Sequence, residues 1–152
     1  MQRPYTYKMS TSRETFDKSE RLCSRKIIEA LFENGNIFHN TVFKVVWDIS
    51  QITLPAPAQV AFSVSKRGFR LAVTRNLIKR RMREAYRKNK NTLYNHLISH
   101  NIQIAFVVIL KGNSVPGYLT IEKAVMETIN KLIVLTSLKP EDRSLTSGSH
   151  IC

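Results

Sequence analysis

The side chains best suited to chemistry in this sequence are the basic ones of a short central segment. The 25 residues from Lys66 to Lys90 contain eleven basic residues and one acid, Glu84, so they carry a net charge of +10, against +13 for the whole chain. The basic residues are Lys66, Arg67, Arg70, Arg75, Lys79, Arg80, Arg81, Arg83, Arg87, Lys88 and Lys90. Arginine donates two parallel hydrogen bonds to one phosphate group, and lysine attracts phosphate as a point charge. The segment therefore predicts the binding of a polyanion.

On an α-helix these side chains would form one cationic face. At about 100° per residue, six polar positions fall within an arc of about 140°. They are Arg75, Asn76, Lys79, Arg80, Arg83 and Arg87. Ile78, Met82 and Ala85 lie on an adjoining arc that would face a core. Like charges four residues apart destabilise an isolated helix by roughly 0.2–0.5 kcal/mol per pair, and a bound polyanion would turn that repulsion into attraction.

Three other interpretations of the basic segment fit its pattern less well. A solvated surface helix normally mixes charges of both signs, which this one does not. A membrane-surface helix, or one that fills a calmodulin-like groove, needs a broad apolar face opposite the charge. Here Val73 and Leu77 project away from Ile78, and Arg81 and Lys88 lie between the two apolar patches. Nucleic acid is the partner that best fits the pattern.

No constellation of catalytic side chains is visible in the sequence. A nuclease that works through metal ions gathers carboxylates, whereas the eleven acids here are scattered, apart from the adjacent Glu141 and Asp142. His96 and His100 have the spacing of a zinc-binding pair, but no glutamate lies between them, so the zinc-protease motif is absent. The sequence therefore indicates a binding protein with no metal site of its own.

The hydrophobic pattern predicts one α+β domain, with helices packed on one sheet. A helix that Ser24 caps should run to Asn34, and the other predicted helices are 72–89, 92–99, which can continue the one before it, and 121–135. The predicted strands are 37–39, 42–49, 59–66 and 102–110, and the last should be central because it is almost wholly apolar. Gly35 should end the first helix in a left-handed turn, and Thr120 should cap the last.

The ends of the chain and its compartment are also predicted. Residues 1–15 should be a flexible segment, 16–136 the folded domain, and 137–152 a disordered tail. The longest apolar run, Ile104 to Leu110, is too short to span a bilayer, so we expect a soluble protein without a membrane partner. Two cysteines do not make a disulfide framework, which favours the cytoplasm. A basic start with no acid before Glu14 leaves an organellar transit peptide as an alternative.

Part of the sequence resembles the signature of the bacterial ribonuclease P protein subunit. The similarity lies in Phe62-Ser-Val-Ser-Lys-Arg67 and in the run from Ala72 to Arg87. Its centre is the pattern R-N-x-x-K-R-x-x-R, which Arg75, Asn76, Lys79, Arg80 and Arg83 supply. Arg21-Leu22, the helix end at Leu31-Phe32-x-x-Gly35 and the following strand pair also match, so the resemblance covers about residues 16–135. The family commonly has glycine two residues before the Ala-Val pair, whereas Gly68 lies earlier, which predicts a turn one residue longer.

The resemblance implies a function and a fold. Proteins of this family are small basic cofactors of a catalytic RNA, which with Mg²⁺ removes the 5′ leader of precursor tRNA. It implies one protein per catalytic RNA, Mg²⁺ bound mainly through the RNA, and a protein that is inactive alone. The implied fold is a two-layer α/β sandwich of order αβββαβα. Its sheet has about four strands and a left-handed βαβ crossover, as in ribosomal protein S5 domain 2.

The resemblance, together with residue chemistry, predicts two groups of site residues. The RNA-binding group comprises Lys66, Arg67, Arg75, Asn76, Lys79, Arg80, Arg83 and Arg87. The leader-cleft group, whose rings could stack on unpaired bases, comprises Phe16, Phe38, Phe62 and Tyr86. Phe38 and Phe62 could equally be core residues. The alternative function is a ribosomal or other structural RNA-binding protein. A helix-turn-helix reader of DNA is disfavoured, since a predicted strand precedes the basic helix.

Overall fold

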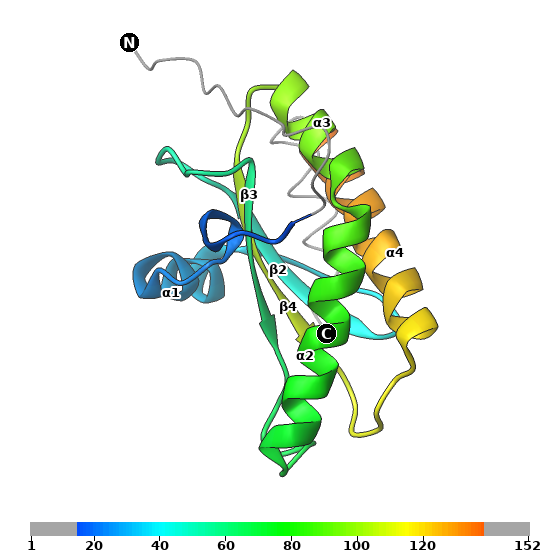
Figure 1. The fold of residues 1–152 in the computed structure, drawn as a ribbon. Coiled ribbons are helices and arrows are strands. Elements are labelled where there is room, and N and C mark those ends of the chain that lie inside the picture. Colours follow the sequence, from blue (N-terminus) through cyan, green and yellow to red (C-terminus); the bar gives the residue numbers. More distant parts are fainter. Residues whose placement is uncertain (1–14, 139–152) are drawn as a thin grey trace.

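Four strands form one sheet, and helices cover its two faces unequally (Figure 1). The computed structural model describes residues 15–138. In chain order, its elements are the 3₁₀-helix η1 (Lys18–Glu20), α1 (Arg25–Asn34), β1 (Asn36–His39), β2 (Phe43–Ile49), β3 (Ala58–Ser63), α2 (Ala72–Asn89), α3 (Asn91–Ser99), β4 (Ile104–Leu110) and α4 (Tyr118–Ser137). The predicted order of helices and strands is confirmed, with α2 and α3 as two separate helices. The predicted terminal segments lie almost entirely outside the described residues.

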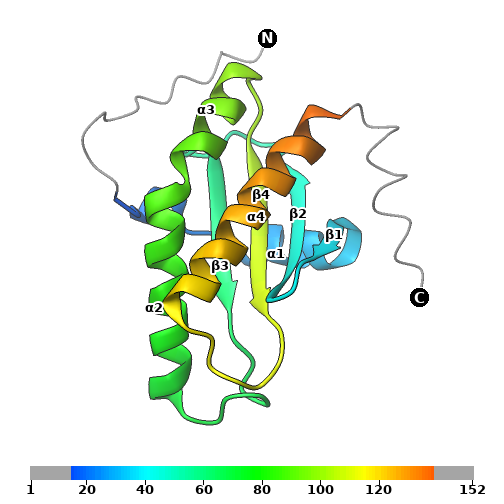
Figure 2. The same cartoon turned by 90° about the vertical axis from the view of Figure 1, so that its right-hand side faces the viewer.

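The sheet has the order β1-β2-β4-β3. β1 pairs with β2, and β2 with β4, in antiparallel fashion, while β3 and β4 are parallel. Parallel neighbours need a crossover, which α2 and α3 provide. In Figure 2 both strands run downward and β4 lies to the right of β3, while Figure 1 shows that α2 lies on the side of the sheet that faces the viewer in Figure 2. This geometry is left-handed, as the family resemblance implied and against the usual preference.

The core has two parts because the sheet is covered on both faces. The larger part lies between the sheet and the helices α2, α3 and α4, and its fully buried side chains include Trp47, Phe106 and Leu132. The smaller part lies under α1 and includes Leu31 and Val107. The strand β4 contributes to both parts, so the prediction of a central strand covered on both faces is confirmed. Within residues 15–138, no helix is long and apolar enough to cross a membrane.

Two predicted helix ends were wrong in detail. Thr120 does not cap the last helix, which begins at Tyr118, after Gly117 and three residues before the predicted start. The Tyr118 hydroxyl donates a hydrogen bond of 3.1 Å to Glu122 Oε2, which ties the first turn together. Gly35 has φ −70°, so it is not in the left-handed region. A glycine is needed there because other atoms lie too close to leave room for a side chain. An added Cβ would lie 2.3 Å from Leu31 O and 3.0 Å from Val46 Cγ1.

Gly35→Ala is expected to lower the free energy of unfolding by about 1–3 kcal/mol, the usual cost of inserting a carbon atom into a closely packed site. Urea denaturation followed by circular dichroism measures this. The matched control is Gly117→Ala, where no atom lies within 4 Å of the added Cβ and φ is −68°. The control should change stability by no more than about 1 kcal/mol. Equal losses in the two variants would show that close approach is not the reason for Gly35.

Candidate nucleic-acid interface

The helix α2 presents a cationic face, as its sequence predicts. Ile78, Met82 and Ala85 are fully buried against the core, which orients the other side of the helix outward. Asn76, Arg80 and Arg83 are exposed, and Arg75, Lys79 and Arg87 are partly exposed. We call these six residues the α2 cationic face. Lys66 and Arg67 are exposed on the turn that leads into the helix, so the structure brings all eight predicted RNA-binding residues to this part of the surface.

Arg75 also holds the turn before α2. Its Nη1 donates hydrogen bonds of 2.8 Å to the carbonyl oxygens of Phe69 and Arg70. The turn is further defined by a hydrogen bond from Arg67 N to Ser65 Oγ and by the buried Phe69 ring. Part of the Arg75 guanidinium is therefore committed to the protein. Its remaining N–H groups can still face a phosphate.

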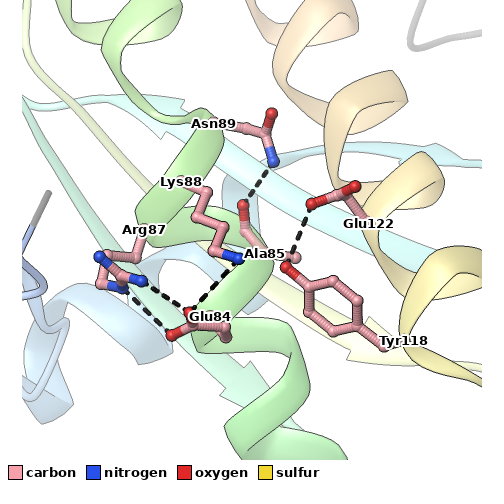
Figure 3. A network of polar contacts seen from close by, with 7 residues as sticks. All are labelled: Glu84, Ala85, Arg87, Lys88, Asn89, Tyr118 and Glu122. Carbon is pink, nitrogen blue, oxygen red and sulfur yellow. Dashed lines mark hydrogen bonds and ion pairs between the residues drawn. The ribbon is translucent and has the colours of Figure 1, made fainter.

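At the other end of the α2 cationic face, Arg87 pairs with the single acid of the basic segment (Figure 3). Its Nη2 and Nε donate hydrogen bonds of 2.6 Å and 3.1 Å to the two carboxylate oxygens of Glu84. The Arg87 hydrogen bond lowers the pKa of Glu84 below its usual value.

Lys88 also has contacts within the protein. Its Nζ lies 3.8 Å from Glu84 Oε1 and 5.7 Å from the centre of the Tyr118 ring. Burial raises the pKa of the Tyr118 hydroxyl. Within the α2 cationic face, Lys79, Arg80 and Arg83 are thus the charges best placed to meet a ligand.

Three of the four predicted leader-cleft residues form one aromatic cluster. The ring centres of Phe16, Phe62 and Tyr86 lie 5.8–6.1 Å apart. Phe16 and Phe62 are partly exposed. Tyr86 is only 1% exposed, so its ring supports the other two and has no free face for a base. Arg21 lies over Phe16, with 5.7 Å between its Cζ and the ring centre. Because Tyr86 belongs to α2, this cluster adjoins the α2 cationic face.

The prediction for Phe38 is contradicted by its position. Phe38 lies on β1, at the edge of the sheet opposite to β3, whereas Phe62 lies on β3. It is 5% exposed and belongs to the larger core. An aromatic residue on a strand can pack in a core or contact a ligand. The position of β1 in the sheet places the Phe38 ring in the core.

A buried polar cluster was missed by the sequence analysis. Glu20 and Lys90 are 1% and 4% exposed and form an ion pair. The Tyr94 hydroxyl donates a hydrogen bond of 2.6 Å to Glu20 Oε1, and burial raises the pKa of Tyr94. Glu20 and Lys90 are 70 residues apart, so no spacing in the sequence signals their contact. Lys90 was counted with the basic segment, but it points into the protein.

The two histidines with zinc-like spacing contact protein groups instead. The His96 and His100 ring centres lie 4.2 Å apart. His96 Nε2 is 2.9 Å from Thr136 Oγ1, and burial lowers the pKa of His96. Among the described residues, no group of three or more His, Cys, Asp or Glu side chains is arranged to hold a metal ion.

Comparison with known proteins connects the chain to one family. Residues 16–132 match the model of the family described as Ribonuclease P. The chain is 34% identical over 124 residues to the ribonuclease P protein component of Porphyromonas gingivalis, which covers 80% of this chain and 90% of that protein. It is 34% identical over 111 residues to that of Chlorobium phaeobacteroides, covering 66% and 76% respectively.

Solved structures of the family share the fold. The ribonuclease P protein of Staphylococcus aureus superposes with a TM-score of 0.60 at 22% identity, over 76% of this chain and 95% of that one. The protein from Thermotoga maritima gives 0.59 at 20% identity, over 74% and 96%. Because the family model spans residues 16–132 and a relative that is 34% identical matches over 90% of its length, the chain belongs to the ribonuclease P protein family.

Proposed function

We propose that this chain is the protein subunit of ribonuclease P. It binds the catalytic RNA through the α2 cationic face and the unpaired 5′ leader of precursor tRNA through the aromatic cluster of Phe16 and Phe62, one protein per RNA. The holoenzyme then removes the leader to leave the mature 5′ end of the tRNA. The observation that carries this proposal is a rigid helix with one core-facing side and one cationic side, in a chain of this family.

The cationic face suits a phosphate backbone. Lys79, Arg80 and Arg83 carry like charges on one side of α2, without acids between them, and a folded helix holds them at fixed spacing. Cations that neutralise phosphates release condensed counterions, which supplies affinity without reading sequence. The turn held by Arg75 adds Lys66 and Arg67 beside the first turn of the helix. Together these residues can position one stretch of folded RNA.

The aromatic cluster suits unpaired nucleotides. An exposed aromatic ring stacks on a base with little regard to its identity, and each such contact contributes about 1–3 kcal/mol. Phe16 and Phe62 are partly exposed above the buried Tyr86. A leader is single-stranded and varies between precursors, so a sequence-tolerant stacking surface is what its recognition requires.

The chain's own side chains do not supply the hydrolytic step in this proposal. The α2 cationic face lacks the grouped carboxylates that hold catalytic Mg²⁺. We assign the metal and the hydrolysis to the RNA, and to the protein the tasks of binding and orienting.

The proposal is tested by cleavage of a 5′-extended precursor tRNA at low Mg²⁺. The cognate ribonuclease P RNA is assayed with and without this protein, and the protein is assayed alone. We expect cleavage at the mature 5′ end only when both are present. If an RNA that is active at high Mg²⁺ gains nothing from the protein, the subunit role is refuted and a structural RNA-binding role remains.

A further inference from the structure

The segment that carries Phe16 is held to the helices by a buried ion pair. Lys90 lies at the junction of α2 and α3, and its Nζ donates hydrogen bonds to Glu20 Oε1 and to the carbonyl oxygen of Thr15. Glu20 Oε2 accepts a hydrogen bond of 2.6 Å from Asp17 N. One lysine and one glutamate thus contact the residues on both sides of Phe16.

The other contacts of this segment lead to the sheet. Leu22 N donates a hydrogen bond of 3.0 Å to Val60 O, and Gln59 Nε2 donates one of 3.0 Å to Ser19 O. They fasten residues 19–22 to β3. In Figure 1 the segment lies beside β3, with α2 and α3 on its other side. Residues 19–22 therefore contact β3, while Glu20 contacts Lys90 and Tyr94 of the helices. Phe16 lies four residues before Glu20.

A buried ion pair is a poor source of stability, because the cost of removing two charges from water offsets much of their attraction. An apolar pair of similar size would often stabilise the fold to the same degree or more. A hydrogen-bonded pair does supply a defined geometry. Here that geometry fixes Thr15 O and Asp17 N, the backbone groups that flank the Phe16 ring.

We propose that Glu20 and Lys90 are positioning residues for leader binding. The pair holds residues 15–20 so that the Phe16 ring stays against Phe62 and Tyr86, with one part exposed to an unpaired base. This inference rests on the proposed function, because it assumes that Phe16 contacts the leader. It adds that the strength of that contact is set by two residues that touch no RNA.

The double variant Glu20→Gln/Lys90→Met tests this. It removes both charges while keeping similar volume, so no lone charge is left buried, but Thr15 O loses its donor. Full-length protein is assembled with the cognate ribonuclease P RNA. Binding of a precursor with an unpaired leader is then compared with binding of the same tRNA without a leader. The double variant and Phe16→Ala should each reduce the leader's contribution to affinity about fivefold or more.

Three further measurements separate positioning from general stability. Affinity for the catalytic RNA alone should stay unchanged in the double variant. Hydrogen exchange should quicken in residues 15–20 and stay slow in β4. The matched control is Asn40→Ala, which deletes hydrogen bonds to Ala124 O and Thr128 Oγ1 far from this segment. It should lower the unfolding temperature without changing the leader's contribution.

The outcomes distinguish the two proposals. If Phe16→Ala weakens leader binding and the double variant does not, the positioning role is wrong and the leader contact stands. If Phe16→Ala has no effect, the leader contact is wrong and this inference falls with it, while the cleavage assay still decides the subunit role. If Asn40→Ala reduces the leader's contribution as much as the double variant, the ion pair acts only through stability.

Discussion

Replacing Lys79, Arg80 and Arg83 together by glutamine is expected to weaken binding to the catalytic RNA about 100-fold near 0.15 M salt, because three phosphate contacts are lost. Each lost phosphate contact should also reduce the magnitude of the slope of log affinity against log salt by about 0.7–0.9, so three should reduce it by about 2–3. Glutamine keeps the helix propensity and much of the side-chain stem, so the fold is expected to persist. Binding titrations at several salt concentrations measure both quantities.

The control for this triple variant removes the same charge elsewhere. Lys26 is exposed on α1, and Lys123 and Lys131 are exposed on α4. Their joint replacement by glutamine should change the salt slope by less than about 1. Arg80→Ala alone should lose about one contact. If both triple variants weaken binding equally, the RNA is attracted by net charge, and the α2 cationic face is not its specific site.

Phe106→Ala is expected to lower the free energy of unfolding by about 3–5 kcal/mol, the usual cost of removing a buried aromatic ring. Phe106 is fully buried on β4, which pairs with β2 on one side and β3 on the other. The centre of its ring also lies 6.0 Å from that of the Tyr86 ring, so Phe106 packs against the buried side of the aromatic cluster. Urea denaturation measures the loss.

The control for the core prediction is Phe32→Ala on α1. The Phe32 side chain is 54% exposed, so its removal should change stability by about 0.5 kcal/mol or less. A loss of under about 1 kcal/mol for Phe106→Ala would mean that the site under Tyr86 repacks, and that the cluster does not depend on this strand.

Features that depend on neighbours in sequence were predicted well. The prediction of a helix at α2 follows from an apolar stripe at Ile78, Met82 and Ala85 that repeats with the helical period. The same period separates the cationic side from the core side, so the RNA-binding residues could be named before the fold was known. The strands were predicted in the right places, but β3 and β4 are shorter than expected. Their pairing with each other ends at Ser63 on β3 and begins at Ile104 on β4, so the residues predicted beyond these positions are not in strands.

Features that depend on distant pairs were predicted poorly. Phe38 and Phe62 look alike in sequence, as aromatic residues of short strands, and only their places in the sheet separate the buried Phe38 ring from the partly exposed Phe62 ring. Gly35 was correctly marked as a helix end, but for the wrong reason, because an added Cβ would lie closest to Leu31 O of its own helix and would also meet Val46 on β2.

By itself, the sequence determined the helix that carries the charge, the face on which the charge lies and, through its motif, the family. These follow from local periodicity and from residue types, which act over a few positions. Only the tertiary structure decided which aromatic rings meet and that Glu20 and Lys90 pair across 70 residues. Such contacts depend on how the chain returns to itself in space, and no local pattern encodes that path.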